Sequence, residues 1–488
     1  MTKGRSIPFV LLLTIFFGFV VVPTIKISYE LFQFQRSLSN ISRFIDYGQG
    51  DLKNLRVVFS NVSESSKTLS KELHYPLWGL VADLTDNSQL LTDIQTYLPE
   101  VFLLAPSAPD FLGFEKSKKY MLVFQNPAEA RGTGGIIGAY AIVTVNRAQF
   151  TVDKVGSNVD LKQMQSMPID ISSDFYFTYG DDPAIWQNSN MSPHFPYGAR
   201  IWSALWKNQT GTDLDGVLAV DPLVLKAILG VTGALKLDDQ SSISSENVVA
   251  ETLSDVYKRF DGRNAQRKSY LVEIAQKTLA ILQSGAYSKI DLGRALIKPY
   301  REHRILFYSS ELKTQNALEQ ILLGGSLDRG GKDYRLVIQN IAGNKMDYYL
   351  QRELEIEVLK CGSKGKTRVK ATVTNQVSEL ESLPTYVMGR LDLGKPEGSD
   401  NSHAISVFLY GPKGSELLSS RVRGHSQEAS FSGYERGRSY YSVPVDLSAG
   451  ESVVVEAEFE GGYPQARTTV QPLVDQQQNR IMDRCVRP

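Results

Sequence analysis

A short glycine-rich segment around residue 130 carries the side chains best suited to phosphate chemistry. Asn126, Glu129 and Arg131 stand there, with glycines at positions 132, 134, 135 and 138. Glycines let backbone N–H groups approach a ligand closely, and a guanidinium offers a planar fork to phosphate oxygens. The segment therefore predicts a phosphate or pyrophosphate site; the alternative is a tight hairpin in which Arg131 and Glu129 pair at the surface. It is not a P-loop, since no Lys-Ser/Thr pair ends it, nor a dinucleotide fingerprint, since no helix follows.

Three arginines spaced by four, Arg259, Arg263 and Arg267, form a second candidate anion site. On a continuous helix, residues four apart drift by only about 40° per step, so the three guanidiniums project from nearly one face. Like charges stacked in this way repel one another unless an anion or carboxylates lie between them. The alternative is a solvated helix face neutralised by neighbouring aspartates. Gly262 is also a potential break in the helix.

Carboxylates of the same region are candidate metal ligands and catalytic groups. Mg²⁺ takes one or two protein carboxylates plus substrate phosphate oxygens, and we expect Glu129, Asp160 and Asp221 to supply them. In a transfer reaction Glu129 or Asp160 would act as the base beside Arg131. Asp221 follows a predicted strand, where ligands of open α/β sheets bind, and it is equally a good helix N-cap. Asn190, in a polar and aromatic loop, is a further candidate pocket residue.

The elements that would position these residues alternate between strand and helix from about residue 110 to 328. Short apolar runs predict strands, and three- and four-residue spacing of apolar side chains predicts helices. The expected strands are residues 120–124, 136–145 and 216–220, and the expected helices are 197–208, 223–229 and one or two within 246–284. This order predicts an α/β domain over 109–328 whose sheet is covered by helices on both faces.

Beyond the glycine pairs at 324–325 and 330–331, the pattern changes to short strands separated by turns. The expected strands are residues 354–359, 368–374, 404–409, 440–445 and 453–459. Their spacing predicts an all-β sandwich with a tail over 329–488. The only two cysteines of the sequence, Cys361 and Cys485, lie in this part. In an oxidising compartment the simplest expectation is that they form a disulfide.

An uninterrupted apolar run occupies residues 6–25. About 20 residues of helix span the ~30 Å hydrocarbon core of a bilayer, and Lys3 and Arg5 before the run favour a cytoplasmic N-terminus. We expect residues 1–27 to be a cytoplasmic tip and single-pass transmembrane anchor, 28–108 a helical stalk, and the remainder extracytoplasmic. A cleaved signal peptide is the alternative, although no small-x-small site ends the run.

The balance of charge argues against one class of partner. The sequence holds 53 basic and 53 acidic residues, so no overall field draws the protein to nucleic acid. Any anion must instead be bound by a local cluster. The sequence does not indicate an oligomeric state.

Three segments together resemble a family of membrane-anchored proteins from actinobacteria and other Gram-positive lineages, catalogued as a domain of unknown function. They are residues 121–145, which contain the run Phe-Gln-Asn-Pro-Ala-Glu-Ala-Arg-Gly-Thr-Gly-Gly, residues 190–196, and residues 214–222. The resemblance spans most of residues 110–350 and implies no established reaction.

The layout is more distantly similar to the LytR-CpsA-Psr (LCP) family of cell-envelope enzymes, which share an N-terminal anchor and an extracytoplasmic α/β domain. Residues 214–233 are similar to that family's strand and Leu-Gly-Gly turn, and residues 246–267 to its helix with spaced arginines. The resemblance implies transfer of polyprenyl-pyrophosphate-linked glycopolymers to peptidoglycan, with arginines on the pyrophosphate and aspartates on Mg²⁺. The family's Arg-x-Asp-Thr motif appears here as Arg131-Gly132-Thr133, without the Asp.

We therefore expect an extracytoplasmic cell-envelope protein that binds a polyprenyl-pyrophosphate-linked glycopolymer through Asn126, Arg131, Asn190 and the three spaced arginines. Whether it is an LCP-like glycopolymer phosphotransferase stays open, because the missing Asp removes an expected metal ligand. The alternative is a non-catalytic envelope scaffold or glycan-binding protein that contacts wall glycan through its β-rich part.

Overall fold

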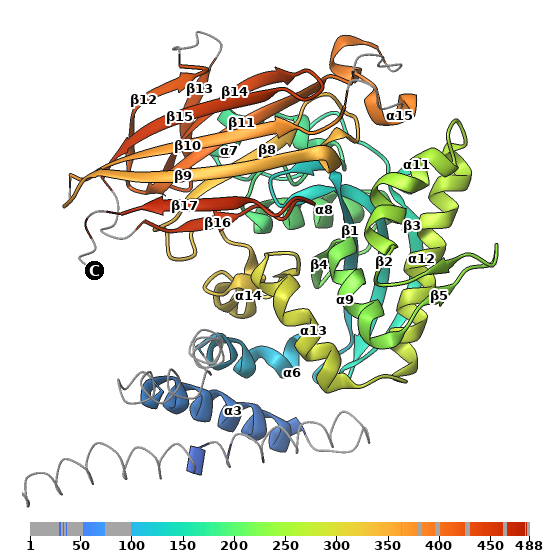
Figure 1. Cartoon of the computed structure of the whole chain (residues 1–488). Coiled ribbons are helices and arrows are strands. Elements are labelled where there is room, and N and C mark those ends of the chain that lie inside the picture. The colour runs from blue at the N-terminus through green and yellow to red at the C-terminus, as the bar shows by residue number, and fades with distance from the viewer. Residues whose placement is uncertain are drawn as a thin grey trace, which may run out of the picture. The chain divides into compact units, whose positions relative to one another are not determined.

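The computed structural model in Figure 1 describes only part of the chain. The described residues are 29, 30, 33, 36, 52–73, 99–362, 364–378, 383–395, 401–424, 430–461, 466–483 and 485. The predicted anchor, residues 6–25, lies outside them, as does much of the predicted stalk. Within the described residues, no helix is both long enough and apolar enough to cross a membrane.

The chain divides into two compact units. The first comprises residues 1–118, 145–150 and 311–318, and the second comprises the remainder. The described elements of the first unit are α3 (Leu52–Glu72), the 3₁₀ turn η2 (Ala105–Ser107), α6 (Ala108–Phe111) and α14 (Leu312–Leu318). Phe59 and Val62, one turn apart on α3, form a small apolar cluster with Ala105 and Ala108, which is the amphipathic packing expected of a surface helix.

The second unit contains a five-stranded mixed sheet with strand order β3-β2-β1-β4-β7. Its strands are β1 (Lys118–Arg131), β2 (Gly134–Asn146), β3 (Gln149–Ser157), β4 (Gly216–Val220) and β7 (Leu306–Ser309). Strands β1 and β4 pair in parallel, with Tyr120 opposite Gly216 and Phe124 opposite Val220. Strand β7 pairs with β4 in the antiparallel sense.

Alternation along the central strands gives this sheet two different faces. Met121 and Val123 of β1 pack into a large core with helix α8 (Phe195–Thr210) and its neighbours. Leu122 and Phe124, the intervening residues, face the other side, where a cavity lies. The helices on that second side are α9 (Pro222–Thr232), α12 (Asn264–Ser284) and α13 (Lys289–Arg301), all three visible in Figure 1.

Shorter elements connect these helices. They are η3 (Asn158–Asp160), α7 (Ser173–Tyr179), η4 (Asp182–Ala184), the hairpin β5 (Leu235–Lys236) and β6 (Ser242–Ile243), α10 (Val248–Ala250), the π-helical segment η5 (Glu251–Asp255), α11 (Val256–Arg259) and η6 (Leu322–Gly324). Of the one or two helices expected within 246–284, the structure has two helical stretches, 248–259 and 264–284. Gly262 separates them, with φ at +69°, a conformation that ends a helix and that glycine adopts without strain.

Two further five-stranded sheets make up the C-terminal part, with orders β12-β15-β10-β9-β17 and β13-β14-β11-β8-β16. Their strands are β8 (Tyr334–Asn340), β9 (Leu350–Lys360), β10 (Lys366–Asn375), β11 (His403–Lys413), β12 (Glu416–Val422), β13 (Phe431–Glu435), β14 (Arg438–Leu447), β15 (Ser452–Glu460), β16 (Thr468–Val470) and β17 (Gln478–Met482). Short helical turns η7 (Met346–Tyr349), α15 (Thr385–Met388) and η8 (Leu391–Leu393) lie between strands. Both sheets contribute to one buried apolar cluster, which includes Leu336, Val369, Val407 and Val455.

The predicted mixture of helices and several sheets is confirmed, and each strand expected beyond residue 350 lies inside an observed one. A disulfide joins Cys361 to Cys485, with their Cα atoms 5.8 Å apart. The division of the chain at residues 108 and 328 stays a prediction.

Candidate functional site

An apolar cavity of about 250 Å³ lies between the second face of the mixed sheet and the helices that cover it. Strands β1, β2 and β4 form its floor, for example through Leu122, Phe124 and Leu218. Helices α9, α12 and α13 and the π-helical segment η5 form its other walls. Single π-helical turns occur frequently at functional sites. The cavity is therefore apolar and built on regular elements, which suits the binding of an apolar group.

Helix α12 lines the cavity with one continuous stripe of side chains. The lining residues of this helix are Leu271, Ile274, Ala275, Thr278, Leu279 and Leu282, which is the spacing of a single helix face. Arg267 stands one turn before Leu271 on the same face. From Arg267 to Leu282 the helix rises by about 22 Å. The guanidinium group of Arg267 therefore lies at the N-terminal end of the apolar face of α12.

Aromatic rings hold Arg267 in place. Its guanidinium carbon lies 4.8 Å from the ring centroid of Tyr257 and 3.8 Å from that of Tyr386, both within the range of cation–π attraction. Among the described residues, its hydrogen-bond partner is the Asn264 side chain. Asn126, which lines the cavity, donates to the Tyr257 hydroxyl over 2.8 Å. Arg267 is thus connected to the cavity wall through a single tyrosine.

Two lysines add positive charge beside this arginine. Lys345 lies with its ammonium 5.4 Å from the Tyr386 ring centroid, and Lys268 donates to Asn158 over 2.7 Å. The charge of Lys345, followed by that of Arg267, lowers the pKa of Tyr386. Burial lowers the pKa of Lys268, and the charges of Arg267 and Lys345 act in the same direction. We call Arg267, Lys268, Lys345, Tyr257 and Tyr386 the basic cluster.

Arg131, the leading candidate from the sequence, is placed differently. It is buried, and its five N–H donors make five hydrogen bonds within the protein, which is the full donor capacity of a guanidinium. The acceptors are Asn188, Glu129 and two backbone carbonyls. The pairing with Glu129 is the predicted one, but the pair is buried, whereas the hairpin alternative placed it at the surface.

Glu129 connects this arginine to the basic cluster. Its second carboxylate oxygen accepts from the ammonium of Lys345. Burial opposes the charged form of Lys345, but the Glu129 carboxylate prevails and raises the pKa of that ammonium. Glu129 is therefore held between two cations, with each of its carboxylate oxygens accepting from one of them.

The glycines around residue 130 serve packing. Residues 125–131 continue strand β1, so only a two-residue turn separates it from β2. A Cβ at Gly132 would lie 2.1 Å from the Met191 carbonyl oxygen, and one at Gly135 would lie 2.1 Å from that of Asn126. Neither position accepts a side chain. At these two positions glycine is required by the close approach of other backbone, and the expectation of a ligand-binding loop here stays a prediction.

The three spaced arginines do not share one helix face. Arg259 ends α11, Arg263 caps α12 and Arg267 lies within α12, because Gly262 interrupts the helix. Arg259 pairs with Glu251 and bonds the Tyr270 hydroxyl at the surface. Arg263 donates to the backbone carbonyl of Arg259. Of the three, Arg267 is the one whose helix face lines the cavity.

The three carboxylates expected to hold Mg²⁺ do not fit that role. Glu129 is engaged by Arg131 and Lys345. Asp221 caps α9 and pairs with the buried Arg304 over 2.6 Å, so the N-cap alternative holds. Asp160 is exposed and accepts from the Ser157 backbone N–H. Among the described residues, no three His, Cys, Asp or Glu side chains gather in a metal-binding arrangement. We derive no metal-dependent step.

Asn190 is fully buried near the β1–β2 turn. It donates to the Thr133 hydroxyl over 2.7 Å and to the Gly135 carbonyl over 3.0 Å. These bonds fix the loop on which it lies against the turn. Asn190 supports the fold around Arg131 and does not line the apolar cavity.

Sequence reasoning missed Lys345, Tyr386 and the cavity itself. Tyr386 and Lys345 lie far from Arg267 along the chain, in the segments between β-strands, and belong to no motif. The apolar stripe of α12 is the one signal that was readable, because its period is that of a helix face. That signal predicts a covered face and does not distinguish a packed core from a cavity.

Comparison with known families gives a partial match. A family model described as "Protein of unknown function (DUF4012)" matches residues 115–257, which is less than half of the chain. The match includes Asn126, Arg131 and Tyr257 and leaves out Arg267, Lys345 and Tyr386. It brings no activity with it. None of the curated proteins matches the chain. Over residues 115–257 the chain is thus similar to a domain family of unknown function.

Proposed function

We propose that this protein binds a lipid-linked phosphate or pyrophosphate, with the lipid chain in the apolar cavity and the phosphate on the basic cluster. The observation that carries the proposal is the α12 face, on which Arg267 directly precedes the apolar cavity lining. A single ligand with an anionic head and a long apolar tail matches both parts. A polyprenyl phosphate has this chemistry.

The net charge in and around the basic cluster favours the binding of an anion. Arg267, Lys268, Lys345 and Arg131 are cationic, whereas Glu129 pairs with Arg131 and Lys345 and Asp160 acts on Lys268. Four positive groups against two negative ones leave an excess of about two charges, close to the charge of a phosphate group. Hydrogen bonds to charged groups contribute about 1.5–3 kcal/mol each. Phosphate contacts with Arg267 and Lys268 therefore supply a useful part of the binding free energy.

Binding is better supported than transfer. A transferase needs a base or a metal at the phosphate, and the candidate groups Glu129, Asp160 and Asp221 are engaged elsewhere or lie apart. We therefore propose a carrier or scaffold that holds a lipid-linked, glycan-bearing phosphate outside the cytoplasmic membrane. The predicted anchor at residues 6–25 would keep it beside the membrane that contains such lipids.

The test compares two ligands that differ only in the head: a polyprenyl phosphate and the matching polyprenol, each titrated into the purified full chain. We expect the phosphate to bind at least about tenfold more tightly, which corresponds to about 1.4 kcal/mol. Gly138 lies in the cavity wall, and a Cβ there would meet ordinary contacts at 3.4 Å or more. Because a Cβ fits at this position, Gly138→Val should place its two added methyl groups in the cavity and weaken both ligands.

Gly293→Ala is the matched control. Gly293 lies in α13, where an added Cβ meets no atom within 4 Å, and it lines none of the cavities. This variant should bind both ligands as the unaltered chain does. Equal binding by the unaltered chain and Gly138→Val, in a protein of unchanged melting temperature, contradicts the placement of the lipid chain.

A further inference from the structure

A large groove lies between helices α9 and α13 and one edge of the β-rich part. Its volume is about 810 Å³, within the range of ligand-binding sites. The helices form one wall, and strand β16 with residues from the segment 472–479 forms the other. It shares no lining residue with the apolar cavity. The groove is therefore a second candidate binding site, with a strand on one side and helices on the other.

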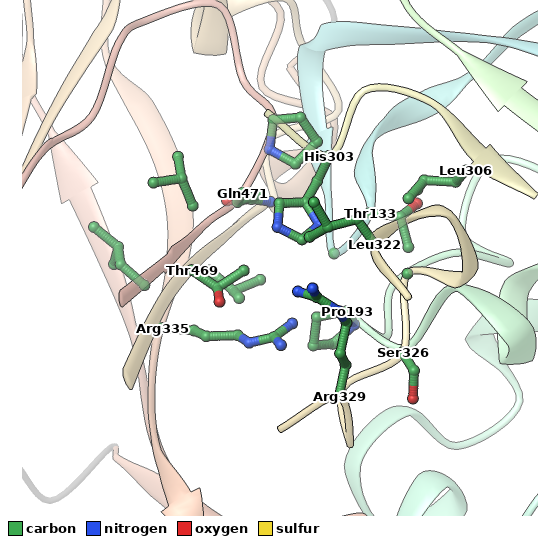
Figure 2. Close-up of a pocket in the computed structure, with 16 residues that line it drawn as sticks. Thr133, Pro193, His303, Leu306, Leu322, Ser326, Arg329, Arg335, Thr469 and Gln471 are labelled. Atoms are coloured by element: carbon green, nitrogen blue, oxygen red, sulfur yellow. The ribbon is translucent and has the colours of Figure 1, made fainter. Parts of the chain in front are cut away.

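The groove follows the edge of strand β16. Three consecutive residues of this strand line it, namely Thr468, Thr469 and Val470. Successive side chains of a strand point to opposite faces of its sheet, so a space bordered by all three lies along the edge of the strand. Figure 2 shows Thr469 and His303 where the groove adjoins a smaller cavity of about 50 Å³. In the part of the chain that the structure describes, β16 ends its sheet and pairs with β8 alone.

The backbone of β16 directs hydrogen-bonding groups away from β8. The Arg467 carbonyl accepts from the Tyr334 N–H over 2.8 Å, so residue 467 faces β8. Backbone groups of alternate residues point to the same side of a strand, so Thr469 also faces β8, whereas Thr468 and Val470 face the other way. The N–H and C=O groups of these two residues lie at the free edge, where an added strand can pair with them.

A buried amide in the groove wall provides a further acceptor. Gln477 lines the groove and is only 6 % exposed. Its Nε2 donates to Asn479 Oδ1 over 2.7 Å, whereas its Oε1 has no hydrogen-bond partner among the described residues. Buried polar atoms are nearly always hydrogen-bonded. This oxygen therefore indicates a ligand that brings an N–H or O–H donor.

The helical wall favours apolar side chains on the ligand. One face of α9 borders the groove through Leu223, Ala227, Gly230 and Val231, which is the spacing of a single helix face. A Cβ added at Gly230 would meet no atom within 4 Å. Small residues on this face thus leave room for side chains of a ligand.

The exposed charges of the groove are basic. Of the charged residues that line it, Lys226 and Lys298 are the exposed ones. The lining acids already bond to arginines: Glu302 accepts from Arg304 over 2.7 Å, and Asp475 accepts from Arg352 over 2.8 Å. The two exposed lysines, one on each helix, complement acidic side chains on a ligand.

We propose that this groove binds an extended peptide segment of a partner protein, which adds as a further strand beside β16. The peptide backbone pairs with Thr468 and Val470, its apolar side chains face α9, and acidic side chains lie near Lys226 and Lys298. In this mode of recognition the backbone pairing gives affinity and the side-chain pockets give specificity. A glycan suits the groove less well, because its described lining residues include no Phe, Tyr or Trp on which a sugar ring could stack. The proposal is independent of lipid binding.

The experiment selects peptides from a phage-displayed library of random dodecapeptides on the purified full chain, and then measures one enriched synthetic peptide by fluorescence anisotropy. We expect alternating apolar residues and at least one Asp or Glu. Gly230→Trp fills the groove and should weaken the peptide by at least about tenfold. Gly293→Trp is the matched control, because Gly293 lies in α13, has open space around an added Cβ and does not line the groove.

Two changes test the backbone pairing directly. Methylating the N–H groups of alternate peptide residues should weaken binding by at least about tenfold in one alternation and little in the other, because only one set donates to β16. Val470→Pro removes an N–H from the free edge. Proline is tolerated on an edge strand where the N–H faces outward, so this variant should keep its melting temperature and bind the peptide more weakly.

The possible results separate the proposal from its competitors. Absence of saturable peptide binding, equal binding of both methylated peptides, or equal losses in Gly230→Trp and Gly293→Trp overturns it. A dimer that Gly230→Trp abolishes would assign the groove to a second copy of the chain, and a soluble N-acetylglucosamine oligomer that displaces the peptide would assign it to a glycan; either result overturns the peptide proposal. Unchanged polyprenyl phosphate binding in Gly230→Trp supports a site separate from the apolar cavity.

Discussion

Arg131 and Arg267 are both buried arginines of the second unit, yet their surroundings differ in a way that separates support from recognition. Arg131 directs five hydrogen bonds to protein acceptors. Arg267 lies against the rings of Tyr257 and Tyr386 and, among the described residues, bonds one side chain, that of Asn264. Aromatic rings fix a guanidinium without using its N–H groups. The comparison teaches that donor occupancy, more than position in a motif, indicates which arginine can receive a ligand.

The largest expected effect is on stability at the first arginine. Arg131→Ala removes five hydrogen bonds and leaves Asn188 and two carbonyls without their donor. Breaking a buried, charged network of this kind costs about 3–5 kcal/mol. Chemical denaturation of the purified chain measures the loss, with Arg294→Ala as an exposed control. A stable Arg131→Ala protein that had lost only lipid-phosphate binding would reverse the comparison.

The second effect is on affinity at the other arginine. Arg267→Gln removes a cation that heads the cavity stripe, so binding of a polyprenyl phosphate should weaken by about ten- to a hundredfold, or about 1.4–2.8 kcal/mol. Binding of the matching polyprenol should change little, since the tail contacts remain. Fluorescence or calorimetric titration of both ligands gives the ratio. Equal weakening of both would assign Arg267 to the cavity wall alone.

A smaller effect should follow from removing the ring that holds Arg267. Tyr386→Ala deletes the closer of the two cation–π contacts, at 3.8 Å, which is worth about 0.5–2 kcal/mol. The affinity for polyprenyl phosphate should fall a few-fold. Tyr386→Phe keeps the ring and serves as the matched control. If the phenylalanine variant binds as weakly as the alanine variant, the hydroxyl and not the ring is the important group.

The smallest effect concerns a buried acid that, like Arg131, is fully engaged. Glu435 accepts from Ser192, Tyr410 and Tyr179, and burial raises its pKa above the usual 4.5. A raised pKa in the folded state means that its stabilising contribution is complete below about pH 4.5 and declines as the pH rises through the folded value. Glu435→Gln should flatten this decline and slightly raise the melting temperature at pH 7. An unaltered pH profile of stability would show that Glu435 is not the titrating group.

The regular elements of this fold were largely readable from the sequence. Strands expected at 120–124, 136–145 and 216–220 lie within β1, β2 and β4. The consecutive residues Leu122 and Val123 show why pattern alone was insufficient, because both are apolar but Leu122 faces the cavity and Val123 faces the α8 core. When both faces of a strand are covered, apolar residues run continuously and their facing is not encoded locally.

The candidate site was harder to predict, because a break in the helix and contacts between residues distant in sequence are not evident from the local pattern. Gly262 breaks the helix on which Arg259, Arg263 and Arg267 would have shared a face. The partners of Arg267 and Glu129 include Tyr386 and Lys345, which lie more than 70 residues away along the chain and belong to no recognisable motif. Arg131, Glu129 and Asp221 have side chains that could bind a ligand. In the structure they form buried ion pairs within the protein, with one another or with Arg304 and Lys345.

The central claim is that one ligand occupies both the apolar cavity and the basic cluster. The most direct measurement is photocrosslinking of the full chain with a polyprenyl phosphate that carries a photoreactive group in its tail, followed by mapping of the labelled peptide. We predict labelling of α12 between Leu271 and Leu282, weakened by Gly138→Val and by Arg267→Gln. Labelling confined to other parts of the chain, or unaffected by both substitutions, would contradict the account.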